Sequence, residues 1–282
     1  MIGFFLVNLH IPTEPQCLTI KASSGEWELT RVPSYEEKIA AIQSGQCAET
    51  YTLEHSVSMH KDGSAACDLA FKEMTPLLLG ASYLSGLSVT ANASLPSSEV
   101  MILCPSNHWP RARSMGYENA ILDTPCQFKS GLEAFVKAWP VSGHDEKVLL
   151  LTHHWLDSMS CWSLEDLYLS ATTLLQIIAA TQVSIEKVKM SYFDGVRNAA
   201  RRVGIRVLSR DFVDMRNNLV HEGTLIGSRS HRKSPAQCAT VAADVLNWFD
   251  EYMHSILGLG PVIRQRFDHH KLLSLNAYSI FD

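Results

Sequence analysis

The sequence lacks the short motifs that identify several large enzyme classes. It contains no Gly-x-x-x-x-Gly-Lys-Ser/Thr phosphate loop and no Gly-x-Gly-x-x-Gly dinucleotide fingerprint. The nearest approach to a hydrolase nucleophile elbow, Gly80-Ala-Ser-Tyr-Leu, ends in Leu where the motif requires Gly. These absences argue against a P-loop nucleotide hydrolase, a nicotinamide enzyme and a serine hydrolase.

Cysteine pairs, clustered metal ligands and long apolar runs are also missing. The seven Cys residues are scattered and form no Cys-x-x-Cys, which favours reduced, buried thiols in a cytosolic protein. His153-His154 and His269-His270 are adjacent pairs whose side chains would diverge by about 100° on a helix, so neither pair chelates a metal by itself. No run of about 18 apolar residues occurs, and the apolar start at residues 1–10 lacks a basic region. We therefore predict a cytoplasmic protein without a membrane span, a metal or a cofactor.

Charge is distributed unevenly along the 282 residues. The net charge of −5 argues against nonspecific nucleic-acid binding by the protein as a whole. Residues 195–233, however, hold nine Arg and Lys against three Asp and Glu. An anionic partner is expected to meet this segment.

The first half of the chain has the mixed pattern of an α+β domain, which we place at residues 1–143. Short apolar or alternating runs predict strands, and Ser23-Ser24-Gly25 predicts a hairpin turn between two of them. Ser34 and Glu37 form a capping-box pattern before a short helix, and Pro76 predicts a kink or break in a second helix. We expect a small, mostly antiparallel sheet with strands at residues 2–9, 17–22, 26–31, 51–60, 87–93 and 99–104.

After a loop at residues 140–146 the pattern becomes helical, and residues 144–282 predict an all-α bundle with a C-terminal tail. Ser163, Ser184 and Ser234 are the expected N-caps of three helices, and Pro235 stands at a first helical position. Short connections between helices are typical of a bundle. The five expected helices cover residues 145–160, 163–182, 184–204, 209–223 and 234–258.

The fourth of these helices, "DFVDMRNNLVHEG", carries a polar group that can be read as a catalytic site. Asn217 and His221 are four residues apart and share one helix face, and the long side chain of Arg216 can reach the same cleft. Gly223 predicts the helix end, where the helix dipole favours a protonated His221. An imidazole beside a guanidinium suits phosphoryl-transfer chemistry, with His as acid or base and Arg stabilising a phosphorane. The pattern alone also fits a solvated helix terminus, which is the commoner origin of such groups.

Arg216, a polar residue directly after it and His221 five positions on resemble the Arg-polar-x3-His signature of HEPN domains. The setting agrees, because this motif lies on the penultimate of five helices and precedes a long closing helix. The resemblance covers roughly residues 145–260, about half of the chain. The order of an α+β half and a HEPN bundle also resembles the ApeA-like defence proteins.

The resemblance implies a metal-independent endoribonuclease that leaves a 2′,3′-cyclic phosphate and acts in toxin–antitoxin or anti-phage defence. It implies that Arg216 and His221 are the catalytic pair, that Asn217 orients His221, and that two bundles pair as a homodimer. An antitoxin or a defence protein would be a further partner, and the α+β half would be a regulatory or recognition domain. Other members of the family are noncatalytic interaction or scaffold modules, and this second function stays open. The sequence departs from the family in one place, where an inward acid is usual and Gln176 stands here.

Residues 197–210 hold five Arg and no acid, which predicts either a phosphate track or a solvated face. In the first interpretation this track leads RNA to the motif. In the second the arginines pair with acids of the α+β half. The expected RNA-binding residues are Arg197, Arg201, Arg202 and Arg210.

Overall fold

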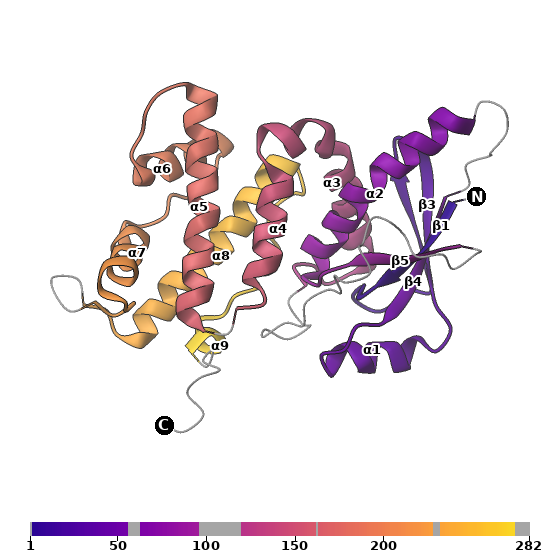
Figure 1. Ribbon diagram of the computed structural model, residues 1–282, viewed down its shortest axis with the longest axis horizontal. Coiled ribbons are helices and arrows are strands. Elements are labelled where there is room, and N and C mark those ends of the chain that lie inside the picture. Colours follow the sequence, from indigo (N-terminus) through magenta and orange to yellow (C-terminus); the bar gives the residue numbers. More distant parts are fainter. Residues whose placement is uncertain (1, 56–62, 96–119, 162, 228–231, 274–282) are drawn as a thin grey trace. The chain divides into compact units, whose positions relative to one another are not determined.

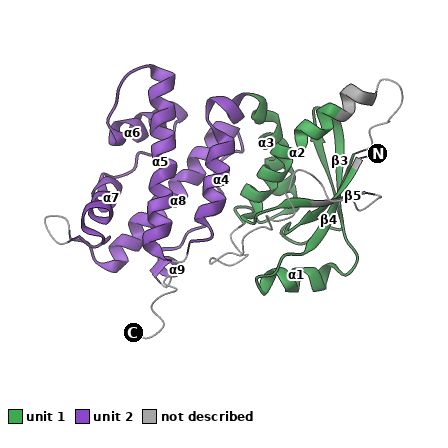
Figure 2. Ribbon diagram, in the orientation of Figure 1, with its two compact units in different colours: residues 1–140 green, residues 141–282 purple. Residues whose placement is uncertain are grey.

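The protein is described by a computed structural model that places residues 2–55, 63–95, 120–161, 163–227 and 232–273 (Figure 1). The chain divides into two compact units, residues 1–140 and 141–282 (Figure 2). The boundary that we expected from the sequence lies at residues 143 and 144. The first unit combines helices with a sheet, and the second is helical, so the α+β class is confirmed.

The first unit contains a five-stranded sheet in the order β2-β3-β4-β1-β5. Each of its four described strand pairs is antiparallel, which confirms the sheet type expected from the sequence. The turn between β2 and β3 lies at Ser23 and Ser24, as predicted. The expected strand at residues 99–104 and the second half of the strand at 51–60 lie outside the described residues. The strands are β1 Ile2–Val7, β2 Cys17–Ala22, β3 Gly25–Arg31, β4 Glu49–His55 and β5 Thr90–Leu95.

The helices of this unit correct three local predictions. Ser34 precedes α1 (Tyr35–Gln43) in a left-handed conformation without a side-chain cap bond, so the capping box is wrong. Of the kink or break expected at Pro76, the break is wrong, because α2 (Gly63–Ser85) continues through it. The expected loop at residues 140–146 is wrong as well, because α3 (Pro125–Asp145) runs through Pro140 and ends at Asp145.

The second unit contains the helices expected of the bundle, with one boundary moved and with a short further helix, α9, in the segment expected as a tail (Figure 1). Ser163 and Ser234 cap α5 and α8 as predicted, and Ser234 forms a full capping box with Gln237. Ser184 does not begin a helix, because α5 continues to Glu186 and α6 is capped by Ser191. The helices are α4 Val148–Ser158, α5 Leu164–Glu186, α6 Tyr192–Val203, α7 Asp211–Glu222, α8 Pro235–Leu257 and α9 His269–Leu273.

Large apolar side chains form the core of the helical unit. Trp155 and Trp248 are fully buried, which fits a structural role for both, whereas Trp162 lies outside the described residues. Helix α5 is long and apolar enough to cross a membrane by length and composition, and half of the qualifying window is buried within the protein. The expectation of buried thiols fails at Cys17 and Cys126, which are exposed.

Helices α5 and α6 approach each other closely at Gly195. A Cβ atom added to Gly195 would lie 2.8 Å from the Cβ of Ala179 and 3.1 Å from its Cα. Real Cβ atoms rarely come this close, so only Gly fits here without a shift of one helix. This contact sets the position of α6, which carries several of the candidate site residues.

We predict that Gly195→Ala destabilises the helical unit although Ala is the better helix former. The gain in helix propensity is about 1 kcal/mol, whereas overpacking a close contact costs about 1–3 kcal/mol. Urea unfolding followed by circular dichroism measures the change. The control is a double-mutant cycle with Ala179→Gly, which removes the methyl group that the new side chain meets. Additive effects in this cycle would contradict the packing account.

Candidate RNA interface on helices α6 and α7

Phe212 joins three helices beneath the candidate site. Its side chain is 1% exposed, and its backbone carbonyl accepts a 2.6 Å hydrogen bond from the hydroxyl of Tyr168 on α5. The rings of Tyr192 and Phe193 at the start of α6 pack on the Phe212 ring, with centroid distances of 5.4 and 6.0 Å. This aromatic cluster fixes the first turns of α6 and α7 relative to α5.

Two of the expected RNA-binding arginines meet at Phe193. The guanidinium carbons of Arg197 and Arg210 lie 5.6 and 5.7 Å from the centroid of the Phe193 ring. Cations at such distances are attracted to an aromatic face, and this attraction restrains both side chains. Arg197 also pairs with Asp194 at 2.7 Å, while no carboxylate in the described chain pairs with Arg210. The two guanidinium groups are therefore held in place, and Arg210 keeps an unpaired charge.

Arg216 lies on α7 one turn after Phe212 and is half-buried. Its Nη1 donates a 3.3 Å hydrogen bond to Oδ1 of Asn217, and its Nε is buried without a hydrogen-bond partner. Within the described ranges, no carboxylate forms an ion pair with Arg216. Burial raises the pKa of Tyr192, and the positive charge of Arg216 opposes that rise. A half-buried guanidinium with an unused donor and no counter-ion is a receptive site for an anion.

His221 occupies the last turn of α7, as the sequence predicted. Gly223 ends the helix in a left-handed conformation, and its N–H donates to the carbonyl of Leu219. The imidazole of His221 is exposed. Among the placed residues no hydrogen bond joins it to Asn217, whose amide oxygen accepts from Arg216. In this single chain, Asn217 thus contacts the Arg of the motif, and His221 is open to solvent.

Arg202, another expected RNA-binding residue, is paired with other residues of the bundle. Its Nη1 and Nη2 donate to the two carboxylate oxygens of Glu146 at 2.6 and 2.9 Å, and its Nε donates to Gln182 at 2.7 Å. The hydroxyl of Tyr252 donates to Glu146 at 2.8 Å and accepts from Arg202 at 3.1 Å. This network joins α5, α6, α8 and the end of α3, and it occupies the donors that a phosphate would need.

The other arginines of the 197–210 run differ in their surroundings. Arg201 is exposed and has no described ion-pair partner. Arg206 pairs with Asp244 at 2.6 Å and with Glu251 at 2.8 Å. The acids that pair with Arg197, Arg202 and Arg206 all come from residues 146–251, so within the described chain these partners belong to the helical unit. The run therefore divides into open guanidinium groups and groups that connect helices.

Two features outside the motif had weak signals in the sequence. Asp268 joins His269 and His270 in a group whose possible ligand atoms lie within 4.8 Å of one another, although its members are largely exposed and Asp268 accepts from the backbone N–H of His270.

A cavity lies along α8, where Asn247, Glu251 and Ser255 recur at a spacing of four. That spacing places the three residues on one helix face, but the sequence does not show the chain segments that complete the cavity. Gln176, the residue at which the sequence departs from the HEPN resemblance, is exposed on α5.

Comparisons with protein-family models, with curated proteins and with solved structures found no match to this chain.

We predict that Arg202 and Arg201, neighbours on α6, respond differently to replacement. Arg202→Ala leaves the carboxylate of Glu146, whose side chain is 12% exposed, without its guanidinium partner. The loss of such hydrogen bonds costs about 2 kcal/mol. Arg201→Ala removes an exposed side chain and is expected to change stability by less than about 0.5 kcal/mol. The midpoint of urea unfolding measures both, and equal shifts would contradict the assignment of Arg202 to the bundle network.

Proposed function

We propose that the helical unit is a metal-independent HEPN-type endoribonuclease, with Arg216 and His221 as its catalytic pair. The observation that carries this proposal is the half-buried Arg216 guanidinium, which has an unused Nε and no described carboxylate partner. A cation in such surroundings is stabilised when an anion binds to it. The phosphate of an RNA backbone is the anion that fits an interface with arginines arranged around an aromatic ring.

The proposed reaction is an intramolecular transesterification. The ribose 2′-OH attacks the adjacent phosphate, and the bond to the 5′-oxygen of the next nucleotide breaks. His221 accepts the proton of the 2′-OH as base, and a His221 imidazolium then gives a proton to the leaving 5′-oxygen as acid. Arg216 stabilises the extra negative charge of the pentacoordinate phosphorane. The products are a 2′,3′-cyclic phosphate and a 5′-hydroxyl, and no step requires a metal or cofactor.

The arrangement of the motif favours a dimeric nuclease. One chain supplies one Arg216 and one exposed His221, and Asn217 contacts the Arg rather than the His. A second bundle facing the first would bring two motifs together and restrict the solvent around both imidazoles. In this proposal the protein is cytoplasmic, and the unit formed by residues 1–140 is a regulatory or recognition domain. An antitoxin or defence protein is a further partner.

A second candidate is a noncatalytic HEPN module that binds a partner within a larger complex. The exposure of His221 and its lack of a described hydrogen-bond partner favour this alternative. The two candidates differ in whether RNA is cut, which the next experiment decides.

Arg216→Ala and His221→Ala are each expected to lower the rate of RNA cleavage by roughly 10²–10⁴-fold, because each removes one catalytic role. The substrates are bulk tRNA and mRNA in the presence of EDTA, and the product ends are analysed for the cyclic phosphate. His153→Ala is the matched control, since His153 is an exposed histidine on α4 of the same unit. Arg216→Lys keeps the charge but loses the planar fork, so we expect an intermediate rate. Wild-type cleavage that persists in both alanine variants would contradict the catalytic assignment.

RNA affinity is expected to depend on Arg197 and Arg210 but not on Arg206. The double variant Arg197→Ala/Arg210→Ala should weaken binding of single-stranded RNA and lower the salt slope by about 0.7 for each lost phosphate contact. Arg206→Ala is the control, because two carboxylates already occupy that guanidinium. Fluorescence anisotropy at several salt concentrations measures the slope. An unchanged slope in the double variant, or an equal change in the control, would place the RNA elsewhere.

A further inference from the structure

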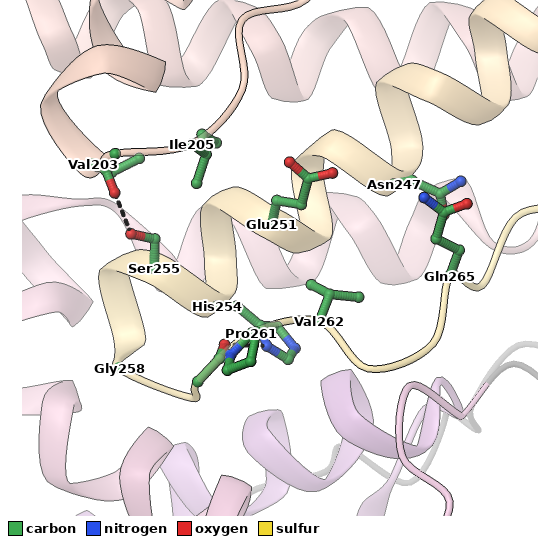
Figure 3. A pocket seen from close by; sticks show the side chains of 12 residues that line it. Val203, Ile205, Asn247, Glu251, His254, Ser255, Gly258, Pro261, Val262 and Gln265 are labelled. Atoms are coloured by element: carbon green, nitrogen blue, oxygen red, sulfur yellow. Dashed lines mark hydrogen bonds between the residues drawn. The ribbon is translucent and has the colours of Figure 1, made fainter.

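A cavity of about 680 Å³ opens along the C-terminal half of α8, within the helical unit (Figure 3). One side is formed by residues 203–205, at the end of α6, and the other by residues 258–265, after the end of α8. This volume is in the range of pockets that hold small molecules. Neither Arg216 nor His221 lines it, so the cavity is separate from the proposed catalytic pair.

Apolar side chains from both chain segments form the walls. Ile205 lies to the left of Glu251 in the view of Figure 3, and Val262 lies below it. Pro261 and the backbones of Gly258 and Gly260 complete this surface. Two apolar walls from separate segments favour a flat, apolar-faced ligand over a fully hydrated one.

Most polar groups of the cavity already have partners. The amide of Asn247 donates to the carbonyl of Phe267 at 3.0 Å and accepts from its N–H at 3.1 Å. The hydroxyl of Ser255 donates to the carbonyl of Val203 at 2.6 Å, and Nδ1 of His254 donates to the carbonyl of Gly260 at 2.9 Å. These bonds hold the two segments against α8, so the walls are largely preformed.

Glu251 and Gln265 line the cavity and have hydrogen-bonding capacity left for a ligand. Oε1 of Glu251 accepts from Nε of Arg206, but a carboxylate has about four acceptor positions. The amide of Gln265 is exposed and makes no side-chain hydrogen bond within the described residues. A ligand with adjacent N–H groups can therefore donate to Glu251 while Gln265 contacts another polar edge.

The ion pairs at Arg206 leave an excess of negative charge beside Glu251. Arg206 pairs with both Asp244 and Glu251, so one positive group stands against two negative ones. Burial lowers the pKa of His254, and its hydrogen bond to Gly260 and its negatively charged neighbour Asp250 oppose that effect. The lowered pKa favours a neutral imidazole at pH 7. A neutral, donor-rich ligand fits this balance better than a phosphate.

We propose that this cavity binds a guanine-type purine base, presented as a nucleoside. Guanine carries N1–H and a 2-amino group side by side, and a carboxylate accepts from both. Its flat ring would lie between the walls of Ile205 and Val262, with Gln265 at the opposite edge of the base. The site does not depend on ribonuclease activity, and it adds a ligand to the helical unit.

The test is isothermal titration calorimetry of the full chain with guanosine, inosine and adenosine. Guanosine should bind at least roughly tenfold more tightly than inosine, which lacks only the 2-amino group and so loses one hydrogen bond to a charged acceptor. Adenosine should bind still more weakly, since its amino group and ring nitrogen offer a different pattern. Equal affinities for guanosine and inosine, or no binding of guanosine at millimolar concentration, would overturn the proposal.

Two neighbouring positions supply a matched pair of variants. Val262→Trp fills the cavity and should abolish guanosine binding, whereas Ile263→Trp alters a 55% exposed side chain that does not line it and should leave the affinity unchanged. Gln265→Ala should weaken binding with little effect on folding, because that amide is exposed. Arg216→Ala should bind guanosine as the wild type does, so a failure of the ribonuclease proposal remains distinguishable. Equal binding by the two Trp variants would place the ligand elsewhere.

Discussion

The candidate site depends on the packing of Phe212 against Tyr168, Tyr192 and Phe193. This cluster ties the first turns of α6 and α7 to α5 through one hydrogen bond and two ring contacts. Because Phe193 restrains Arg197 and Arg210, and Arg216 follows Phe212 by one helical turn, three guanidinium groups take their positions from the same aromatic core. The positions of these charged side chains thus depend on the packing of buried aromatic side chains.

The arginines of the helical unit divide into two groups by their partners. Arg202 and Arg206 are held by carboxylates that come from other helices, and they stabilise the bundle. Arg210 and Arg216 have no carboxylate partner in the described chain, and Arg216 is also half-buried. This difference supports the proposal that an anion, RNA phosphate above all, binds at Arg216 and its neighbours. It also explains why the net charge of residues 195–233 does not identify the anion-binding arginines, since this segment contains both groups.

Helix ends with strong local signals could be predicted from the sequence, and contacts between distant residues could not. Ser163, Ser234 and Gly223 act where the pattern placed them, because capping and left-handed helix ends depend on nearby backbone. The capping box at Ser34 and the N-cap at Ser184 are wrong, because Ser34 adopts a left-handed conformation without a cap bond and α5 continues through Ser184 to Glu186. The motif residues Arg216, Asn217 and His221 lie on one helix as expected. The engagement of Arg202 by Glu146, 56 positions away, had no signal in local spacing.

The most direct test of the central claim observes the Arg216 guanidinium as RNA binds. In ¹⁵N NMR of the full chain, titration with a 2′-O-methyl dinucleotide supplies the phosphate without the attacking hydroxyl. The account predicts a shift of the Arg216 Nε–H resonance, because this donor gains its missing acceptor, and a much smaller shift for Arg206, which is already paired. The Arg216→Lys variant assigns the signal. A shift at Arg206 with none at Arg216 would contradict the account.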